Sequence, residues 1–434
     1  MKKNKNGLLI AFFVSLSLSS FAQEKKHLTL DQAVSLGLEN SKNLKIDQTK
    51  IEQAEAHIIE AKNKKLPDLS ISGSALALAN ANVDLKIAQG GGGAAPKANS
   101  AFFGSANLSL PLFAGGRIKY GIQSAEYVLD AVRLNAENDK EAVAFTIAKA
   151  YTNLFKAEQM IEVLEENLKA SRQRDSQFLK LENNGVIARN DRLKANLQTS
   201  NLELQLLDAQ NNFLVANLNM DLLLGLPDET QIEVDPGFWE NSNSLHDLKY
   251  YYSEAYQNRN DLQAVGKQQS AANLGSKAAK AEELPSIAVT AGYVAAQVPK
   301  ILTVTNAANV GLGVQYELSH LWKKNSSLLN AEAKERELAA TSDLLRDQIK
   351  LEVFRDFNSS ELAQKKIDVL ENAQTQADEN YRITKNKYDN GLATMTELLD
   401  ANTAQISAHI EVTNAKADAA LAQKKLQQTA GILL

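Results

Sequence analysis

The feature that most constrains this chain is a run of roughly 65 residues, Arg117 to Asn183, that contains no proline and only one glycine, Gly121. At 1.5 Å per residue, a continuous helix over this run would be about 100 Å long. The run ends at Asn184-Gly185, a dipeptide typical of a turn, and a second helical pattern follows. Because no single globular core needs a helix of this length, we predict a long helical hairpin.

A second hairpin of the same kind is predicted 206 positions later, around Asn390-Gly391. Acidic residues follow both turns: Asp191 after the first, and Glu397 and Asp400 after the second. Glu397 and Asp400 are three residues apart, so on a helix they share a face. We place the two hairpin tips at about residues 184–191 and 390–400.

The two hairpins belong to a tandem duplication. Leu284-Pro285 repeats Leu66-Pro67 at an offset of 218, and Gly431 repeats Gly225 at an offset of 206. The two offsets differ by twelve residues. Because one inserted residue would rotate the rest of a helix by about 100°, we expect this length difference to lie in the loop between strands. Each half then reads helix–strand–strand–long helix–turn–helix, at residues 23–227 and 258–434. Residues 228–257 are expected to connect the halves and to pack around the outside of the helices.

Period-two patterns predict four strands, at about residues 68–79, 101–113, 286–294 and 309–318. Segments of about 9–11 residues are long enough to cross a bilayer. Four strands cannot close a barrel alone, so membrane-spanning strands would require an oligomer. The alternative is a soluble sandwich of four strands.

A narrow stripe of leucines follows the first hairpin turn. Its members are Leu193, Leu197, Leu204, Leu207, Leu214 and Leu218, and the polar Ser200 and Asn211 fall on the same stripe. A stripe this narrow is typical of packing against neighbouring helices, with the opposite face left in water.

Residues 1–22 have the pattern of a secretory signal peptide: a basic start, a short apolar run and small residues ending at Ala22. The alternative is an anchor that stays attached. Removal of this segment would take three lysines from a chain of formal charge −5, leaving −8. The chain has no cysteine, and residue 23 is Gln, so neither disulfides nor lipidation at that position is expected.

Nothing in the sequence indicates catalysis, a cofactor, a metal site or a nucleic-acid partner. The five histidines lack paired-ligand spacing, no Gly-x-Ser-x-Gly motif occurs, and no basic stripe alternates with aromatics. The glycine-rich run Gly90 to Gly93 is not followed by Gly-Lys-Ser/Thr, so it is expected to be a loop rather than a phosphate site.

With these segments in order, the chain resembles the TolC family of outer-membrane efflux channels. The matching pieces are Leu28 to Val34, Leu66-Pro67, Pro111 to Arg117, Gly225-Leu226-Pro227 and the two Asn-Gly turns. The resemblance implies a homotrimer in which three copies of four strands form one twelve-stranded barrel in outer-membrane lipid. Three copies of the helices would continue it as a long tube across the periplasm.

The resemblance also implies a gate at the hairpin tips. Glu397 and Asp400 match positions of acidic rings that constrict the pore, Asp191 matches an acidic latch residue, and Tyr388 matches another latch position. A basic residue that some relatives carry after the turn is replaced here by Ala393. The four turn residues, Asn184, Gly185, Asn390 and Gly391, would lie where a periplasmic adaptor docks.

The chemistry of these acids can also be argued from symmetry alone. Three-fold symmetry would turn each carboxylate into a ring of like charges, which favours cations in a narrow pore. The alternative for Asp191 and Glu397 is that they only stabilise their helices, because acidic side chains in the first turn interact favourably with the positive end of the helix dipole. Asp400 lies one turn further in, where this alternative explains less.

The sequence therefore predicts a passive outer-membrane exit duct of a tripartite efflux pump or a type I secretion system, working with an adaptor and an inner-membrane pump. A non-conducting structural or adhesive coiled-coil protein of the envelope is the alternative. A membrane-fusion adaptor also has hairpins but lacks the duplication. The sequence does not specify the cargo.

Overall fold

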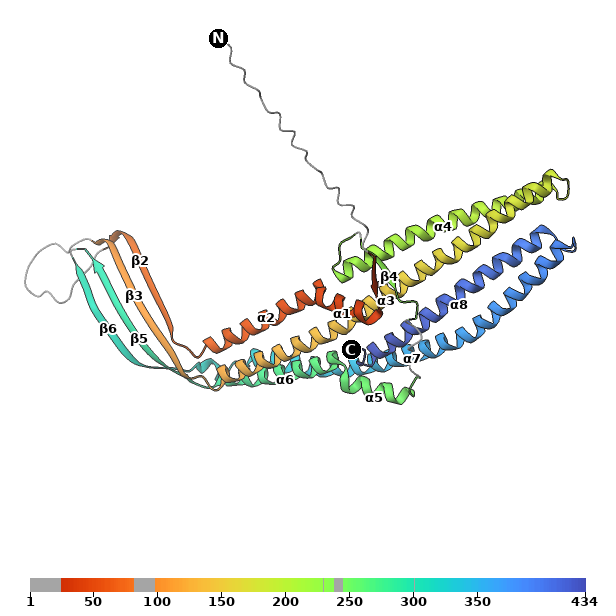
Figure 1. Ribbon diagram of the computed structural model, residues 1–434. Helices are drawn as coiled ribbons and strands as arrows, with labels where there is room; N and C mark the ends of the chain where they lie inside the picture. The colour runs from red at the N-terminus through yellow and green to blue at the C-terminus, as the bar shows by residue number, and fades with distance from the viewer. Residues whose placement is uncertain (1–24, 82–97, 229, 238–244, 300) are drawn as a thin grey trace, which may run out of the picture. The chain divides into compact units, whose positions relative to one another are not determined.

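The computed structural model describes residues 25–81, 98–228, 230–237, 245–299 and 301–434. Long helices dominate these residues, and six strands accompany them (Figure 1). In chain order the elements are β1 Lys25–Leu28, α1 Leu30–Asn40, α2 Lys42–Asn63, β2 Asp68–Ala81, β3 Ala98–Phe113, α3 Arg117–Asn183, α4 Arg189–Leu224, β4 Gln231–Val234, α5 Leu248–Asn258, α6 Asn260–Lys280, η1 Ala281–Glu283, β5 Ser286–Val298, β6 Leu302–Gln315, η2 Leu318–Leu321, α7 Ser326–Asp389 and α8 Met395–Thr429.

The chain divides into two compact units. The helical unit contains the described residues of Met1–Asn40, Ile147–Ser242 and Lys366–Asp418. The strand unit contains those of Ser41–Thr146, Asn243–Lys365 and Ala419–Leu434. Helices α3, α7 and α8 contribute residues to both units, so each unit is built from segments far apart in the sequence.

Four strands of the strand unit form one antiparallel sheet in the order β2-β3-β5-β6. The register pairs Asp68 with Ser109 and Ser286 with Gln315, so the start of β2, the end of β3, the start of β5 and the end of β6 lie at the same end of the sheet. A bulge interrupts each pairing once. Long helices follow β3 and β6 at this end.

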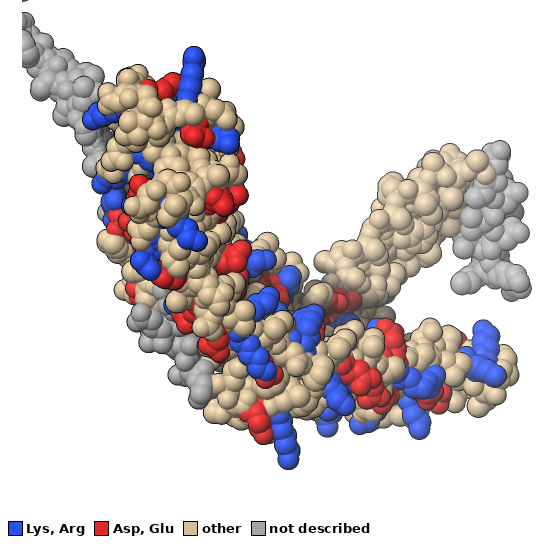
Figure 2. Space-filling model, turned by 90° about the vertical axis from the view of Figure 1, so that its right-hand side faces the viewer, with Lys and Arg blue, Asp and Glu red and all other residues tan. Residues whose placement is uncertain are grey.

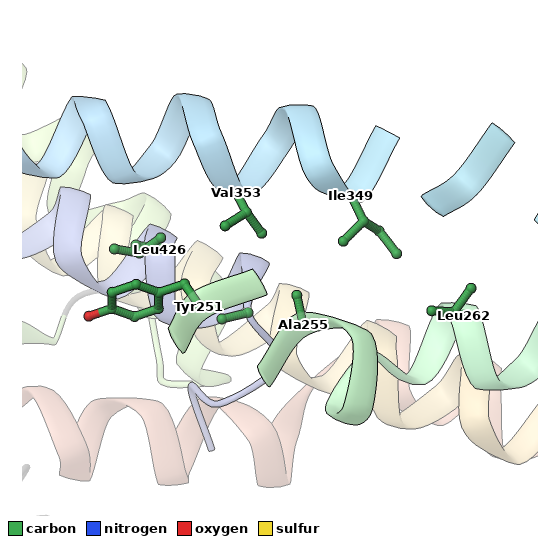
Figure 3. Packing of buried hydrophobic residues seen from close by; sticks show 7 residues of the cluster. Tyr251, Ala255, Leu262, Ile349, Val353 and Leu426 are labelled. Carbon is green, nitrogen blue, oxygen red and sulfur yellow. The ribbon is translucent and has the colours of Figure 1, made fainter. Parts of the chain in front are cut away.

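One apolar core of the strand unit is a cluster of buried side chains from α5, α6, α7, α8 and the residue directly after α8. It comprises Tyr251, Ala255, Leu262, Ile349, Val353, Leu426 and Ala430 (Figure 3). Tyr251 and Ala255 lie in the segment 228–257, which therefore contributes to this core and does not only wrap the outside of the helices as the sequence led us to expect.

In the helical unit the long helices lie in the order α4, α3, α8, α7. Ser171 of α3 hydrogen-bonds Thr199 of α4 at 2.8 Å, and Lys156 of α3 pairs with Asp418 of α8. Lys416 of α8 pairs with Glu371 of α7 at 2.8 Å. Leucines from α3 and α4 and Ile406 of α8 form a shared apolar core.

The helical unit also contains a two-stranded parallel sheet, in which β1 lies beside β4. The hydroxyl of Tyr151, fully buried, donates to the Leu28 carbonyl at 2.8 Å and accepts from the Asp235 amide at 2.6 Å. Asn217 on α4 accepts from the Ile232 amide and donates to the Thr230 carbonyl. These bonds satisfy buried polar groups and fix β4 against the helices.

Helix boundaries repeat between the two halves of the chain. The break between α1 and α2 at Ser41 has its counterpart at Arg259, between α5 and α6, 218 positions later. The counterpart of α1 is thus α5, which begins at Leu248, ten residues before the start of the second half predicted from the sequence. Helices α1 and α5 share few residue types, so letter matching detects only the end of this pair.

The strands also differ in extent from the alternation patterns. Strand β3 begins at Ala98, and β6 runs from Leu302 to Gln315. Tyr316 and Leu318, predicted to end the last strand, lie beyond it, and Leu318 begins the short helix η2. The start of β6 is rich in threonine, asparagine and alanine, which do not produce an apolar alternation.

Candidate functional site

The four-stranded sheet has one apolar and one small-polar face. Residues paired across an antiparallel sheet point to the same side. On one side Ile71 lies opposite Ala106, and Val289 lies opposite Leu110 on β3 and Leu312 on β6. The other side carries mainly serine, asparagine, threonine and glycine, in the pairs Ser70–Asn107, Ser72–Ser105, Ser109–Thr290, Gly292–Asn309 and Thr290–Gly311, with Leu76, Phe103 and Val294 toward the other end of the sheet.

The sheet carries almost no charge. Asp68, the first residue of β2, is the only Asp, Glu, Lys or Arg in the four strands. Figure 2 shows this surface in tan, in contrast to the helices, where blue and red side chains alternate. On the apolar face, Ile71 and Val310 expose about four fifths of their surface. Such a face in water would be unfavourable, so a lipid-facing role fits it better.

Both edges of the sheet are open among the described residues. Strand β2 pairs only with β3, and β6 pairs only with β5, although each is 14 residues long. Long, uncharged open edges are usually protected in soluble proteins, because they pair with other chains. The four-stranded sheet is therefore incomplete as it stands in one chain.

Each hairpin turns on a glycine in the left-handed conformation. Gly185 has φ 71° and Gly391 has φ 74°. After α3, the amides of Gly185 and Val186 donate to the carbonyls of Glu182 and Leu181, both at 2.9 Å. After α7, the amides of Gly391 and Leu392 bond in the same way to Tyr388 and Lys387. This Schellman arrangement satisfies the last helical carbonyls and requires glycine for its φ angle.

Glu397 caps the start of α8. Its carboxylate accepts from the Thr394 amide at 2.6 Å and from the Thr394 hydroxyl at 2.9 Å, and its own amide donates to the Thr394 Oγ1 at 3.2 Å. This reciprocal pair is a capping box. The hydrogen bond from the Thr394 amide, followed by that from its hydroxyl, lowers the pKa of Glu397 below its usual value. Within one chain, the structure thus favours helix capping for Glu397.

The other candidate gate residues lie near it. Asp400 is exposed on the second turn of α8, and Asp191 is half-buried in the first turn of α4. Tyr388, at the end of α7, packs against Phe178 with ring centroids 6.0 Å apart. Burial, and then the nearby negative charge of Asp191, raise the pKa of Tyr388. The structure therefore brings Asp191 and Tyr388 of the two tips together.

The predicted signal-cleavage residue, Ala22, lies outside the described residues.

The two tips contact each other through residues that the sequence did not single out. Met395 and Ala195, both buried, join Phe178 in an apolar cluster between the hairpins. Lys194 on α4 donates to the Thr396 hydroxyl at 3.1 Å, and Arg174 on α3 donates to the side-chain amide oxygen Oδ1 of Asn402 at 3.1 Å. The capping box was detectable as Thr-x-x-Glu, whereas these contacts between hairpins have no local sequence signal.

The leucine stripe of α4 has no partner within the described residues. Leu204, Leu207 and Leu214 expose 61 to 64% of their surface, while the opposite face of α4, with Leu202 and Ala209, packs on α3. Helix α7, at the other side of the helical layer, exposes Val369 and Ile383 in the helical unit. Both outer helices thus present apolar side chains that the described residues leave exposed.

The described residues contain no cluster of three or more His, Cys, Asp or Glu side chains that could hold a metal ion. In the same part of the chain, no helix combines the length and apolar character needed to cross a membrane.

Comparisons with known proteins address the fold and the family. Three solved structures share the fold at TM-scores of 0.70 to 0.75: VceC from Vibrio cholerae, CmeC from Campylobacter jejuni and MtrE from Neisseria gonorrhoeae. They are 19%, 17% and 19% identical to this chain; each alignment covers 93% of it, and 96%, 86% and 89% of the respective structure. All three are described as outer-membrane proteins or channels. The search of curated proteins finds no match.

The family comparison covers nearly the whole described chain. The model of a family described as outer membrane efflux protein matches residues 33–226 and 251–432, which include both hairpins and all four strands of the large sheet. This is a family of channel proteins rather than enzymes, which agrees with the absence of catalytic motifs in the sequence. The chain therefore belongs to the outer membrane efflux protein family.

Proposed function

We propose that three copies of this chain form a passive exit duct through the outer membrane, with the helices extending into the periplasm. The four-stranded sheet carries this proposal, because it combines an apolar face, a small-polar face and two open edges. In a closed barrel the apolar face would contact lipid and the small-polar face would line water. A barrel also removes the unpaired edges, which lipid does not tolerate.

The strand directions support closure by identical copies. Neighbouring strands alternate in direction across the order β2-β3-β5-β6, so β2 and β6 run in opposite directions. Strand β6 of one copy could then pair antiparallel with β2 of the next. Three copies would give twelve strands, an even number within the range of outer-membrane barrels.

The helical layer supports the same assembly. Because α4 and α7 are its outer members, α4 of one copy would meet α7 of the next in a closed ring. The exposed leucines of α4 would then become buried. A head-to-tail contact of this kind closes when the rotation is one third of a turn. The repeated element order, with α1 and α5 as counterparts, supports the proposed origin of each copy by tandem duplication.

The proposed gate is the ring of hairpin tips. Asp400 is the better candidate for an acidic ring, because it is exposed and its carboxylate makes no ion pair among the described residues. Asp191 and Tyr388 are proposed as a latch between the two tips of one chain. Glu397 would contribute to the ring while also capping α8.

The partners follow from the proposed position of the tips. The turns Asn184-Gly185 and Asn390-Gly391 would meet a periplasmic adaptor, which joins the duct to an inner-membrane pump or type I secretion system. The pump would supply the energy and select the cargo. Export by residues 1–22, with cleavage after Ala22, is part of the proposal.

Fractionation and conductance test the proposal. We expect the protein in the outer-membrane fraction, as a trimer that runs as a single band on a gel until it is heated, and as a conducting pore in planar bilayers. A soluble periplasmic monomer without conductance would overturn the proposal and favour the structural coiled-coil alternative.

A further inference from the structure

The end of the sheet where all four strands meet the helices is surrounded by basic side chains. Segments 62–68, 114–120, 277–286 and 315–325 contain nine Lys or Arg and four Asp or Glu, whereas the whole chain has 47 and 52. The charge balance is therefore reversed at this one end of the sheet. We call the six exposed cations nearest to the strands the basic collar: Lys64, Lys65, Arg117, Lys119, Lys323 and Lys324.

These cations are available to an outside partner. All six side chains are exposed, and none forms an ion pair with another described residue. Two acids of the same region are already engaged: Glu317 accepts from the Ser319 hydroxyl, and Glu283 accepts from the Asn325 amide at 3.2 Å. The four segments thus keep a net formal charge of +5, although Lys323 interacts electrostatically with Glu317.

An exposed apolar group lies next to two of these lysines. Leu318 and Leu321 of η2 and the adjoining Trp322 expose 59%, 72% and 72% of their surface, and Lys323 and Lys324 follow directly. Tryptophan next to lysine is typical of the membrane interface, where the ring enters the headgroup layer and the ammonium stays in water. The first half of the chain has Gly115-Gly116 near the corresponding place, so this group occurs once per copy.

We propose that the basic collar and the η2–Trp322 group bind anionic phospholipid in the periplasmic leaflet of the outer membrane. The inference rests on the proposed function, since it requires the strands to cross that membrane. The uncharged sheet ends where the cations begin, which fits the boundary between the hydrocarbon core of the membrane and the lipid headgroups. Phosphate groups without a compensating amine complement unpaired ammonium and guanidinium groups, and juxtamembrane lysines attract such lipids.

Fluorescence quenching by brominated lipids tests this proposal. The chain has two tryptophans, so Trp239→Phe leaves Trp322 as the only reporter. The trimer would be reconstituted in bilayers with brominated phosphatidylglycerol or brominated phosphatidylcholine. We expect Trp322 to be quenched by both, with an association constant about fivefold higher for phosphatidylglycerol at low salt. The preference should fall in 0.5 M NaCl, because salt screens exposed charges.

Paired variants separate a lipid site from a general charge effect. Lys323→Gln with Lys324→Gln should reduce the preference, because these two lysines directly follow the Trp322 reporter, and Lys323→Arg with Lys324→Arg should retain it. Lys365→Gln with Lys366→Gln, an adjacent exposed pair on α7, should leave it unchanged. Equal quenching by both lipids in the parent protein would overturn the lipid proposal alone. No quenching by either lipid would instead contradict the membrane position of the strands.

Discussion

A single carboxylate at the second hairpin tip illustrates how one residue can support two roles. Glu397 closes a capping box with Thr394, which satisfies two backbone amides at the start of α8. The same carboxylate stays exposed, so it could also contribute charge to a pore ring. Asp400, one turn further along α8, has no capping partner to explain its position. The two acids should therefore respond differently to mutation.

Thr394→Ala should loosen the start of α8 without changing its charge. The lost cap corresponds to roughly fivefold faster amide exchange in residues 394–400, measured by hydrogen–deuterium exchange. Thr403→Ala, on the same helix, removes only a hydroxyl bonded to the Leu399 carbonyl and should have little effect. The hydrogen bonds from Thr394 lower the pKa of Glu397 in the folded state. The contribution of Glu397 to the stability of the fold is therefore fully present above the unfolded-state pKa of about 4.5, and it is lost as the pH falls through the lower folded-state pKa. Unchanged exchange in Thr394→Ala would show that the capping box does not hold this turn.

Asp221 should make the fold less stable at neutral pH than at mildly acidic pH. It is fully buried, one of its carboxylate oxygens has no hydrogen-bond partner, and burial, then Asp228, raise its pKa to about 6. The folded state therefore binds this proton more tightly than the unfolded chain does. Unfolding free energy should fall by up to about 3 kcal/mol as the pH rises from about 4 to about 6.

Thermal unfolding of the solubilised protein at pH 5 and pH 7.5 measures the part of this effect that lies above pH 5. Asp221→Asn should raise the unfolding temperature at pH 7.5 and reduce the difference between the two pH values. Asp208→Asn, an exposed position on the same helix, should behave like the parent protein. If Asp221→Asn keeps the full pH difference, another group is responsible for it.

At the scale of the elements, local signals predicted the helices and turns well. The absence of proline and glycine from α3, and the two Asn-Gly turns, act within a few residues, and the structure has its helix ends and left-handed glycines there. The alternation of β3 likewise indicated which side chains share a face. The break at Ser41 was missed, because neither proline nor glycine marks it.

What the sequence could not supply were contacts between distant segments. The Lys194–Thr396 and Arg174–Asn402 bonds join hairpins more than 200 residues apart, and no local pattern selects these pairs. The burial of Tyr251 likewise depends on the packing of α5 against α7 and α8. Such contacts require the tertiary arrangement of the helices.

The leucine stripe of α4 should be necessary for a stable trimer. Leu207→Glu with Leu214→Glu would place two carboxylates in the proposed contact with the next copy, where burial of an unpaired charge is costly. The temperature at which the trimer dissociates on a gel should fall by roughly 10 °C or more. Gln205→Glu with Asn212→Glu adds the same charge to α4 away from the stripe and should leave this temperature close to that of the parent. Equal dissociation temperatures of the two double variants would exclude the leucine stripe from the interface between copies.

On the scale of the whole molecule, charge is distributed unevenly along the proposed duct. The small-polar face of the sheet would offer mainly hydroxyl, amide and glycine groups to the lumen, whereas the hairpin tips carry the acids Asp191, Glu397 and Asp400 among basic side chains such as Arg189 and Lys387. A pore with an uncharged barrel and an acidic gate would discriminate between ions at the gate. Cargo selection would then lie with the pump, because the barrel lining lacks charged groups to recognise a particular class.

Removing the acid at position 400 should weaken the cation selectivity of the pore. Asp400→Asn would take three negative charges from one ring of the proposed trimer, which should shift the reversal potential in a salt gradient toward zero and reduce block by divalent cations. Glu397→Gln should change selectivity less, since its capping bonds hold its carboxylate near the Thr394 amide, and the double variant should show the largest effect. Asp208→Asn, on α4, should keep the selectivity of the parent, as measured in planar bilayers. Unchanged selectivity in the double variant would remove both acids from the pore lining, and the closed gate would then have to rest on the apolar cluster of Phe178 and Met395.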